Sequence, residues 1–227
     1  MPERAPRSGR AKLAPRRRPP RRPDRARRTA SPDARRTAIL EAALKVFAAN
    51  GFEHARLDEV AAKAGVAKGT LYLHFRDKEA LFEDMIRAAA APILAKMSAE
   101  TAHPDLPVAA LLERLFALFR TEVLGTERKL IIRLVIAEGA RFPRIAAFYH
   151  REVVSRVLAL VRRAMTRAAV RGEISSDAAA RFPELVMAPL LLAVIWDGLF
   201  QRFEPLDVKG LLAAHAEVLT GSKRRRP

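Results

Sequence analysis

The sequence predicts an all-α protein: a small N-terminal head of three helices that includes a helix-turn-helix, followed by a larger body of six helices. Apolar residues recur at helical spacing through most of the chain after residue 38. No segment alternates apolar and polar residues as a half-buried β-strand does. Between residues 57 and 75, two short helices meet at a tight turn, which is typical of a helix-turn-helix.

The first predicted helix begins after Ser31. Ser31-Pro32-Asp33 combines a capping hydroxyl, a proline suited to the first turn and a carboxylate near the positive helix end. Asn50-Gly51 predicts the end of this helix. We expect it to be a scaffold that holds the next two helices at a fixed angle. Its apolar stripe contains Ile39, Leu40, Ala43, Leu44 and Phe47.

The next two helices are short, and each has one apolar face. Gly65 follows the first of them, where the chain needs a residue that tolerates positive φ. The first helix buries Leu57, Val60, Ala61 and Ala64, and the second buries Leu71 and Phe75.

The second short helix also carries a set of polar side chains: Lys68, Thr70, Tyr72 and His74, with Gly69 among them. Phosphate oxygens need hydrogen-bond donors, and base edges need short polar groups that enter the major groove. These residues are therefore candidates for DNA contact. An ordinary helical hairpin with a solvated face accounts for the spacing equally well.

The body is predicted to be helical throughout. Asp77 is placed to cap a fourth helix that continues towards Met97, and the segment 101–107, with two prolines, breaks it. The helices expected after it cover 111–119, 130–139 and 143–170, then a segment that begins at Asp177, and finally 208–219. The segment from Asp177 is apolar nearly all round over 185–196 and is interrupted by Pro183 and Pro189.

The net charge of +17 is concentrated at the two ends of the chain. Residues 1–36 hold fourteen Lys and Arg against three acidic residues, and residues 223–226 add four cations. We expect residues 1–31, rich in Arg and Pro, to form a disordered tail that follows phosphates or enters a neighbouring minor groove. The alternatives are a tail that is merely solvated and an over-long start of the sequence. The predicted divisions are this tail, the head (32–76), the body (77–221) and a basic tail (222–227).

Other features of the sequence restrict the class of protein. The chain has no cysteine, so it has neither disulfides nor a thiolate metal site. Its longest uncharged apolar run, Leu185–Trp196, is too short to cross a bilayer, and no apolar segment follows the basic N-terminus as in a secretory signal. We expect a cytoplasmic protein that is not attached to a membrane.

The segment from Arg35 to Ile86 resembles the DNA-binding domain of the TetR family of transcriptional regulators. The resemblance is carried by AILEAALKVFAANGF (38–52), DEVAAKAGV (58–66), KGTLYLHF (68–75) and DKEALF (77–82). It implies a dimeric repressor that a small hydrophobic ligand releases from a palindromic operator on double-stranded DNA. It also implies a three-helix DNA-binding head and a six-helix body for ligand binding and dimerisation.

By this resemblance, Lys68, Gly69, Thr70, Tyr72 and His74 lie where family members touch DNA, and Lys78 lies near a backbone phosphate. Lys can donate to guanine O6 and N7, so Lys68 is the best candidate for a base contact. Tyr72 is expected to donate to a phosphate, and Thr70 to bind a phosphate or a thymine methyl. His74 has either a contact role or a structural one, and Gly69 serves either close approach to DNA or packing.

Two positions depart from the family pattern. Arg56 and Ala67 stand just ahead of the second and third helices, where the family usually has Ser or Thr. A lost hydroxyl removes a cap worth about 1 kcal/mol. Arg56 could replace the lost phosphate bond with a charged one, so it joins the predicted DNA-binding residues.

In the body, the resemblance implies a ligand cavity and a dimer face. The helix over 185–200 and the terminal helix are the best candidates for the dimer face, and a purely intramolecular core is the alternative. Ordinary core packing is likewise the alternative for each residue proposed to line the cavity. The candidates are Phe116, Phe119, Phe142, Phe148, Tyr149, Met187 and Trp196.

A ligand-responsive repressor has three alternatives. A non-specific DNA-coating protein would use the basic ends, and an activator on the same fold is compatible with the sequence. An enzyme has no support, because the sequence shows no metal-ligand spacing, Gly-rich phosphate loop or nucleophile arrangement. We therefore predict no catalytic residue, no metal and no cofactor. The effector, the operator and the regulated genes are not readable from the sequence.

Overall fold

The computed structural model describes residues 31–221, and every regular element in this range is a helix. The expected basic tail (222–227) lies outside the described residues, as does all of the expected N-terminal tail (1–31) except Ser31. The head contains α1 (Pro32–His54), α2 (Leu57–Ala64) and α3 (Lys68–His74). The body contains α4 (Lys78–Ala102), α5 (Val108–Phe119), π-helix η2 (Arg120–Leu124), α6 (Lys129–Glu138), α7 (Pro143–Tyr149), π-helix η3 (His150–Val154), α8 (Ser155–Val170), α9 (Ala178–Arg181), α10 (Glu184–Leu199) and α11 (Val208–Thr220).

The first helix begins as predicted but ends later. The Ser31 hydroxyl accepts a hydrogen bond from the Ala34 amide at 3.2 Å, so it caps α1. At Gly51 the backbone turns to φ 72°, a conformation that favours glycine, and one more helical turn follows to His54. The sequence correctly located the break in the helix, but the chain resumes helical geometry after it because Phe52 is buried in the head core.

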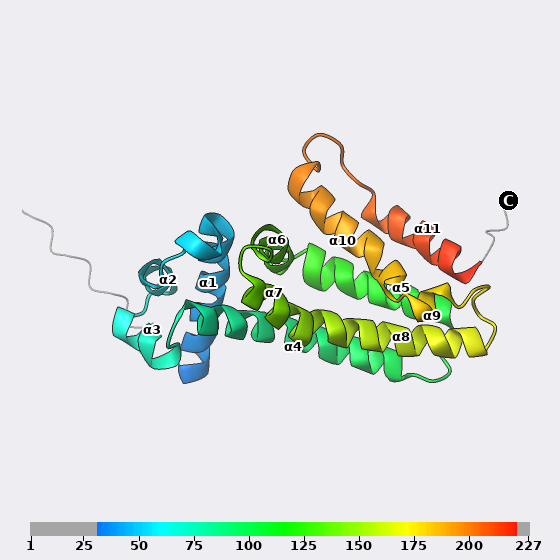
Figure 1. Cartoon of the computed structure of the whole chain (residues 1–227), viewed down its shortest axis with the longest axis horizontal. Coiled ribbons are helices and arrows are strands. Elements are labelled where there is room, and N and C mark those ends of the chain that lie inside the picture. The colour runs from blue at the N-terminus through cyan, green and yellow to red at the C-terminus, as the bar shows by residue number, and fades with distance from the viewer. Residues whose placement is uncertain (1–30, 222–227) are drawn as a thin grey trace, which may run out of the picture.

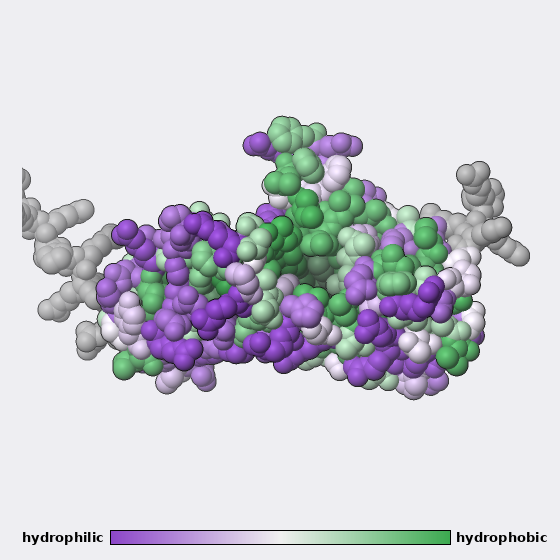
Figure 2. All heavy atoms as spheres, viewed as in Figure 1, coloured by the Kyte–Doolittle hydropathy of each residue, from purple (hydrophilic) through white to green (hydrophobic). Residues whose placement is uncertain are grey.

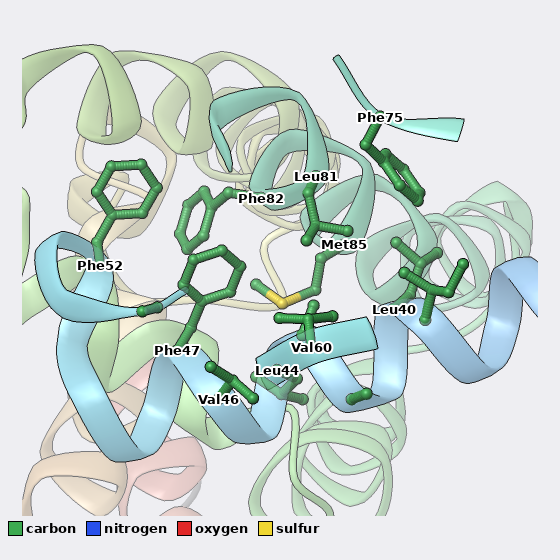
Figure 3. Packing of buried hydrophobic residues seen from close by; sticks show 14 of the residues in the cluster. Leu40, Leu44, Val46, Phe47, Phe52, Val60, Phe75, Leu81, Phe82 and Met85 are labelled. Atoms are coloured by element: carbon green, nitrogen blue, oxygen red, sulfur yellow. The ribbon is translucent and has the colours of Figure 1, made fainter. Parts of the chain in front are cut away.

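The head is held together by an aromatic and aliphatic core. Phe47 lies edge-on to Phe82 with ring centroids 5.3 Å apart, and Phe52 contacts both rings. Figure 3 shows these three rings gathered between α1 and α4, with Leu44 and Val60 beside Met85. Because Leu81, Phe82 and Met85 come from α4, the first helix of the body completes the core of the head.

The two short helices form the predicted helix-turn-helix. Gly65 adopts φ 71°, and its amide closes the end of α2 onto the carbonyls of Ala61 and Ala62. The chain then enters α3, where Leu71 and Phe75 are buried against the head core. Neither Arg56 nor Ala67 supplies a side-chain cap to the helix that follows it.

The body is an elongated helical bundle. α4 runs from the head along α8, and α10 and α11 lie on the opposite side of α5 from α4 (Figure 1). Asp77 caps α4 by accepting a hydrogen bond from the Ala80 amide at 2.7 Å. A second apolar core fills the space between α5, α8, α10 and α11.

Two details of the body differ from the sequence prediction. The segment 143–170 is helical throughout, but its middle five residues, His150–Val154, are a π-helix between α7 and α8. The helix expected from Asp177 is two helices, because the chain breaks at Phe182-Pro183 between α9 and α10. Pro189, expected to interrupt the second, lies inside α10 and is accommodated there.

Direct contacts join the head to the body. Phe142, at the start of α7, packs edge-on against Phe52 with ring centroids 5.1 Å apart. Arg141 Nη2 lies 2.5 Å from Glu53 Oε2 at the end of α1. Packing of α6 against α1 continues this interface. Within residues 31–221, no helix is long and apolar enough to cross a membrane.

Candidate DNA-binding face and body cavity

The helix α3 presents one face to solvent at the end of the molecule. Burial of Leu71 and Phe75 fixes the rotation of α3, so its opposite side is exposed. We call this side the recognition face. It consists of Lys68, Gly69, Thr70, Tyr72 and His74, of which Thr70 alone is half-buried. Figure 1 shows α3 at the opposite end of the molecule from α9.

Lys68 is held by the preceding helix. Its ammonium nitrogen lies 2.9 Å from Asp58 Oδ2 and 6.0 Å from the centroid of the Tyr72 ring. The hydrogen bond and charge of Asp58 raise the pKa of Lys68 above its ordinary value. The amine is therefore a cation at physiological pH, and it is aligned along the exposed side of α3.

Gly69 has open space around it. A Cβ added there would meet no atom within 4 Å, so packing inside the protein does not require glycine at this position. Of the two readings left open by the sequence, close approach of another molecule is the one that this geometry favours. The hydroxyl of Thr70 and the imidazole of His74 make no hydrogen bond within residues 31–221, so both are available to a ligand.

The two remaining predicted contacts differ in their surroundings. Arg56 is exposed just before α2, and its side chain caps no helix. Lys78 is half-buried: its Nζ donates to the Glu53 carbonyl at 2.6 Å and lies 4.8 Å from the centroid of the Phe52 ring. Lys78 thus ties α4 to α1 in this structure, while the Arg56 side chain is exposed to solvent.

Leu73 is a residue of α3 that the sequence reasoning did not select. Its side chain is 86% exposed, although it lies between the buried Leu71 and Phe75. A leucine two positions from one buried residue and two from the next is out of helical register with both. This offset is the feature of the sequence that could have identified Leu73 as an exposed residue of α3. An exposed apolar side chain on such a face can contact the methyl group of thymine.

A cavity of about 130 Å³ lies inside the body, and we call it the body cavity. Its walls come from α4, α5, α6, α8 and α10 and from the two π-helical segments with their flanking residues. Figure 2 shows a hollow bordered by hydrophobic atoms below α10. Four predicted ligand contacts line the cavity: Phe116, Phe119, Tyr149 and Met187.

The other three predicted residues lie outside the cavity wall. Phe142 packs against Phe52 at the junction of head and body. Phe148 is buried between the guanidinium groups of Arg87 and Arg151, at 4.7 and 5.2 Å from its ring centroid. Trp196 donates its indole N–H to the Glu204 carbonyl at 2.6 Å and stacks edge-on with Phe200.

The two π-helical segments shape the cavity. Each begins directly after an aromatic residue of the wall, Phe119 before η2 and Tyr149 before η3. Each also contributes a valine to the wall, Val123 or Val153. A π-helical turn inserts an extra residue and so changes the direction in which the flanking side chains point. Interruptions of this kind are frequent at functional sites.

Most of the cavity wall is apolar, and the sequence reasoning did not foresee its one charged member. Arg128, just before α6, lines the cavity and donates from Nη1 to the carbonyl and the carboxylate of Glu122 at 3.0 and 3.2 Å. Glu122 also binds Lys96. The hydrogen bond from Lys96, with the charge of Arg128, lowers the pKa of this carboxyl group. No group of His, Cys, Asp and Glu residues within 31–221 is arranged to hold a metal ion.

Comparison with known proteins agrees with this geometry. Residues 39–85 match the family profile of bacterial regulatory proteins of the tetR family, and residues 110–214 match the C-terminal domain of AefR-like transcriptional repressors. The structure is similar to that of native NalD, the secondary repressor of the MexAB-OprM multidrug efflux pump in Pseudomonas aeruginosa. The TM-score is 0.65 at 22% identity, over 86% of this chain and 99% of that one. At that identity the likeness concerns the fold.

Two relatives carry the comparison at the sequence level. The HTH-type transcriptional regulator UidR of Escherichia coli (strain K12) is 30% identical over 189 residues, which cover 82% of this chain and 94% of that protein. The HTH-type transcriptional repressor BepR of Brucella suis biovar 1 (strain 1330) is 33% identical over 168 residues, covering 70% and 76%. With both family profiles matched in order and the recognition face exposed on α3, the chain belongs to the TetR family and is a DNA-binding transcriptional regulator.

Proposed function

We propose that the protein is a homodimeric repressor. Each protomer inserts α3 into the major groove of one half of a palindromic operator, and a small hydrophobic molecule in the body cavity releases the dimer from the DNA. The observation that carries the proposal is the exposed polar side of α3, whose opposite side is locked in place by Leu71 and Phe75. As a protein that acts on chromosomal DNA, it is proposed to work in the cytoplasm.

The recognition face has the chemistry that such a role needs. Lys68 and Tyr72 supply a cation and a hydroxyl at the start and middle of α3, and Thr70 and His74 supply hydrogen-bonding groups that have no side-chain partner within residues 31–221. Side chains of this kind bind phosphate oxygens and base edges. Arg56, exposed ahead of α2, is proposed as a further phosphate contact. Lys78, bound to the Glu53 carbonyl, is proposed to support the position of α4 and to reach phosphate only after leaving that carbonyl.

Dimerisation is supported by the distribution of exposed apolar side chains. Seven of the twelve large hydrophobic residues that are exposed within the described part of the chain lie between Phe182 and Phe203, on α10 and its flanks. Val218 adds another on α11. Contiguous exposed apolar surface of this kind marks an interaction site. A two-fold pairing of α10 and α11 would cover it and would join two heads for one operator.

The body cavity supports the release step. Its wall includes Ile131 and Ile132 of α6, and the same helix packs against α1 of the head. Occupation of the cavity can therefore bias the position of the head through α6. A ligand shifts the equilibrium only by its difference in affinity for the two arrangements.

The test is selection of bound sequences from random duplex DNA at physiological salt, with the full chain and with a chain lacking residues 1–30. An inverted-repeat motif obtained with both proteins is expected, because the recognition face lies within residues 31–221, which both proteins contain. Failure of both proteins to select a motif would refute the repressor proposal and favour a non-specific DNA-coating protein. The net charge of +17 is the observation behind that second candidate. A reporter gene placed behind the selected motif then separates repression from activation.

A further inference from the structure

The body cavity has almost no polar side-chain groups in its wall. Of its 21 lining residues, Arg128 and Tyr149 alone carry N–H or O–H groups in their side chains, and none carries a carboxylate. A cationic ligand would therefore lose its hydration without gaining a counter-charge from the wall. This excludes ammonium compounds as good ligands and favours molecules that are largely apolar.

Tyr149 supplies an unused hydrogen-bond donor. Its hydroxyl makes no hydrogen bond to any residue within 31–221, and because Tyr149 is half-buried in the cavity wall, this hydroxyl reaches accessible space and is free to bind water or a ligand. Burial raises the pKa of Tyr149 to about 12, because the charged phenolate is disfavoured away from water. The group therefore keeps its proton at physiological pH and can donate it to an acceptor atom in the cavity.

Arg128 makes an anionic ligand a poor fit. Its Nη1 already binds the Glu122 carboxylate at 3.2 Å, and Lys96 binds the same carboxylate. An anion placed against this guanidinium would approach Glu122 as well, and it would also bury its charge among apolar side chains. A neutral oxygen acceptor avoids both costs.

The size of the cavity limits the ligand to about one ring. An apolar cavity of about 150 Å³ in another protein holds a benzene molecule. The body cavity, at about 130 Å³, is of that size. Because the cavity is open on one side, a short substituent on the ring can extend beyond this volume.

We propose that the body cavity binds a neutral molecule the size of a single substituted ring, with one oxygen acceptor that receives a hydrogen bond from the Tyr149 hydroxyl. This proposal rests on the proposed function, since it names the class of molecule that would release the repressor. Tyr149, at the junction of α7 and η3, is then the residue that distinguishes a ligand with an acceptor from a pure hydrocarbon.

The test compares three probes of nearly equal shape by calorimetry on the full chain. Acetophenone carries the oxygen acceptor, α-methylstyrene replaces that oxygen with a CH₂ group, and the 1-phenylethylammonium ion carries a positive charge. The wild-type protein is expected to bind acetophenone roughly fivefold to tenfold more tightly than α-methylstyrene, as one buried hydrogen bond would give. The cation is expected not to bind.

Two variants locate the effect. Tyr149→Phe keeps the ring and removes the hydroxyl, so acetophenone affinity should fall to that of α-methylstyrene, whose own affinity stays unchanged. Thr166→Val is the control: it removes a hydroxyl of α8 that donates to the Arg162 carbonyl outside the cavity wall, and it should change neither affinity. If Tyr149→Phe does not fold, the wild-type preference for acetophenone over α-methylstyrene still decides whether an acceptor is recognised. A further variant, Ile132→Phe, fills the cavity and should abolish the affinity for both probes.

Equal affinities of the wild type for acetophenone and α-methylstyrene would overturn the role of Tyr149. Tighter binding of benzoate than of acetophenone would overturn the choice of a neutral ligand, and binding of none of the probes would overturn the ligand class. Each of these results leaves the operator motif from the DNA selection untouched. Failure of the inference and failure of the proposed function are therefore separate outcomes.

Discussion

Lys68, a proposed DNA contact, is paired with an acidic side chain in the structure without DNA. Its ammonium group is paired with Asp58 on the neighbouring helix, and both side chains are more than half exposed. An exposed pair of this kind contributes little to the stability of the fold. In the proposed complex with DNA, the Lys68–Asp58 pair weakens binding, since a phosphate that approaches Lys68 must compete with the carboxylate of Asp58.

Replacing Asp58 is therefore expected to strengthen DNA binding. In Asp58→Asn, Lys68 loses its competing carboxylate, and the dependence of log K on log salt should become steeper, by at most about 0.9 because one lysine neutralises at most one phosphate. Lys68→Ala should make the slope shallower. Fluorescence anisotropy with an operator duplex over a series of salt concentrations measures both changes.

Asp105→Asn is the control for this experiment, because it removes the same charge from an exposed position between α4 and α5, in the body. If Asp58→Asn and Asp105→Asn gave the same slope, Lys68 would not be a phosphate or base contact.

Tyr149 leads to a prediction about pH. Its pKa rises from 10.0 in the ordinary state to about 12 in the folded protein, so the folded state holds the proton more tightly than the unfolded state. The resulting stability is complete below pH 10 and is lost as the pH rises towards 12. Two pKa units correspond to about 3 kcal/mol. Tyr149→Phe lacks this contribution, so the difference in unfolding free energy between wild type and variant should change by up to about that amount between pH 9 and 12.

Urea unfolding at several pH values measures this difference, and the comparison cancels the titration of groups common to both proteins. A difference that stays constant over the range would mean that Tyr149 is as accessible to water as an ordinary tyrosine.

At the scale of elements, α6 joins the three parts of the molecule that the proposed function connects. It packs against α1 of the head, contributes Ile131 and Ile132 to the body cavity, and contacts α10. The contact with α10 is ionic: Asp197 binds Lys129 at 2.8 Å and also binds Arg133. Only about a quarter of each of these side chains is exposed. Loss of one partner therefore leaves the other charges partly buried and unpaired, which costs more free energy than it does at the surface.

Removing the shared carboxylate should destabilise the body. Asp197→Asn leaves two partly buried cations without their counter-charge, and we expect a loss of about 1–3 kcal/mol in the free energy of unfolding. Asp177→Asn is the matched control: its pair with Arg181 is 62% exposed on both sides, so its effect should stay within about 0.5 kcal/mol. Chemical denaturation of both variants tests this, and equal effects would show that the α6–α10 ion pairs contribute no more than a surface pair.

Helix positions were predictable from the sequence wherever a local signal decides them. Ser31 and Asp77 cap their helices as expected, and Gly65 adopts positive φ where a helix was predicted to end. Features that depend on tertiary packing were not predictable. The π-helix η3 lies within a continuous amphipathic pattern, and η2 extends the helix that was predicted to end at residue 119. The extra turn of α1 exists because Phe52 enters the core formed with α4.

Of the two candidate sites, the recognition face was predictable from the sequence and the cavity wall was not. The recognition face follows from the periodicity of α3, because the two buried residues alone determine which side faces solvent. The cavity wall does not follow from composition, since an aromatic residue in an amphipathic helix suits a core and a cavity equally. Phe119 lies in the wall, and Phe142 packs at the junction with the head. Arg128 gave no signal, because a single arginine before a helix is ordinary.

Within residues 31–221, the protein has a head with a polar outer side at one end and an exposed apolar surface on α10 and its flanks. Leu185, Leu191 and Leu192 are each more than two-fifths exposed, and Leu199 and Phe203 are exposed still further. A single head offers a small contact area on DNA, and two heads joined at a fixed spacing read two half-sites as one ligand. In the proposed dimer, the apolar surface and the recognition face therefore serve the same function, although they lie in different regions of the chain.

A charge placed on the apolar surface should separate the two heads without altering either one. Leu192→Glu puts a carboxylate where a partner protomer would exclude water, which opposes association while leaving the exposed side chain solvated in the monomer. We expect a folded monomer by light scattering. Its affinity for a full palindrome should fall by roughly 100-fold or more, because the second head is no longer tethered to the first. Its weak affinity for a single half-site should be unchanged.

Val170→Glu, at the end of α8, is the control: it places the same charge at another apolar residue that is 84% exposed, and it should remain dimeric. A monomeric Leu192→Glu protein that still bound the palindrome with full affinity would show that each head reads its operator alone.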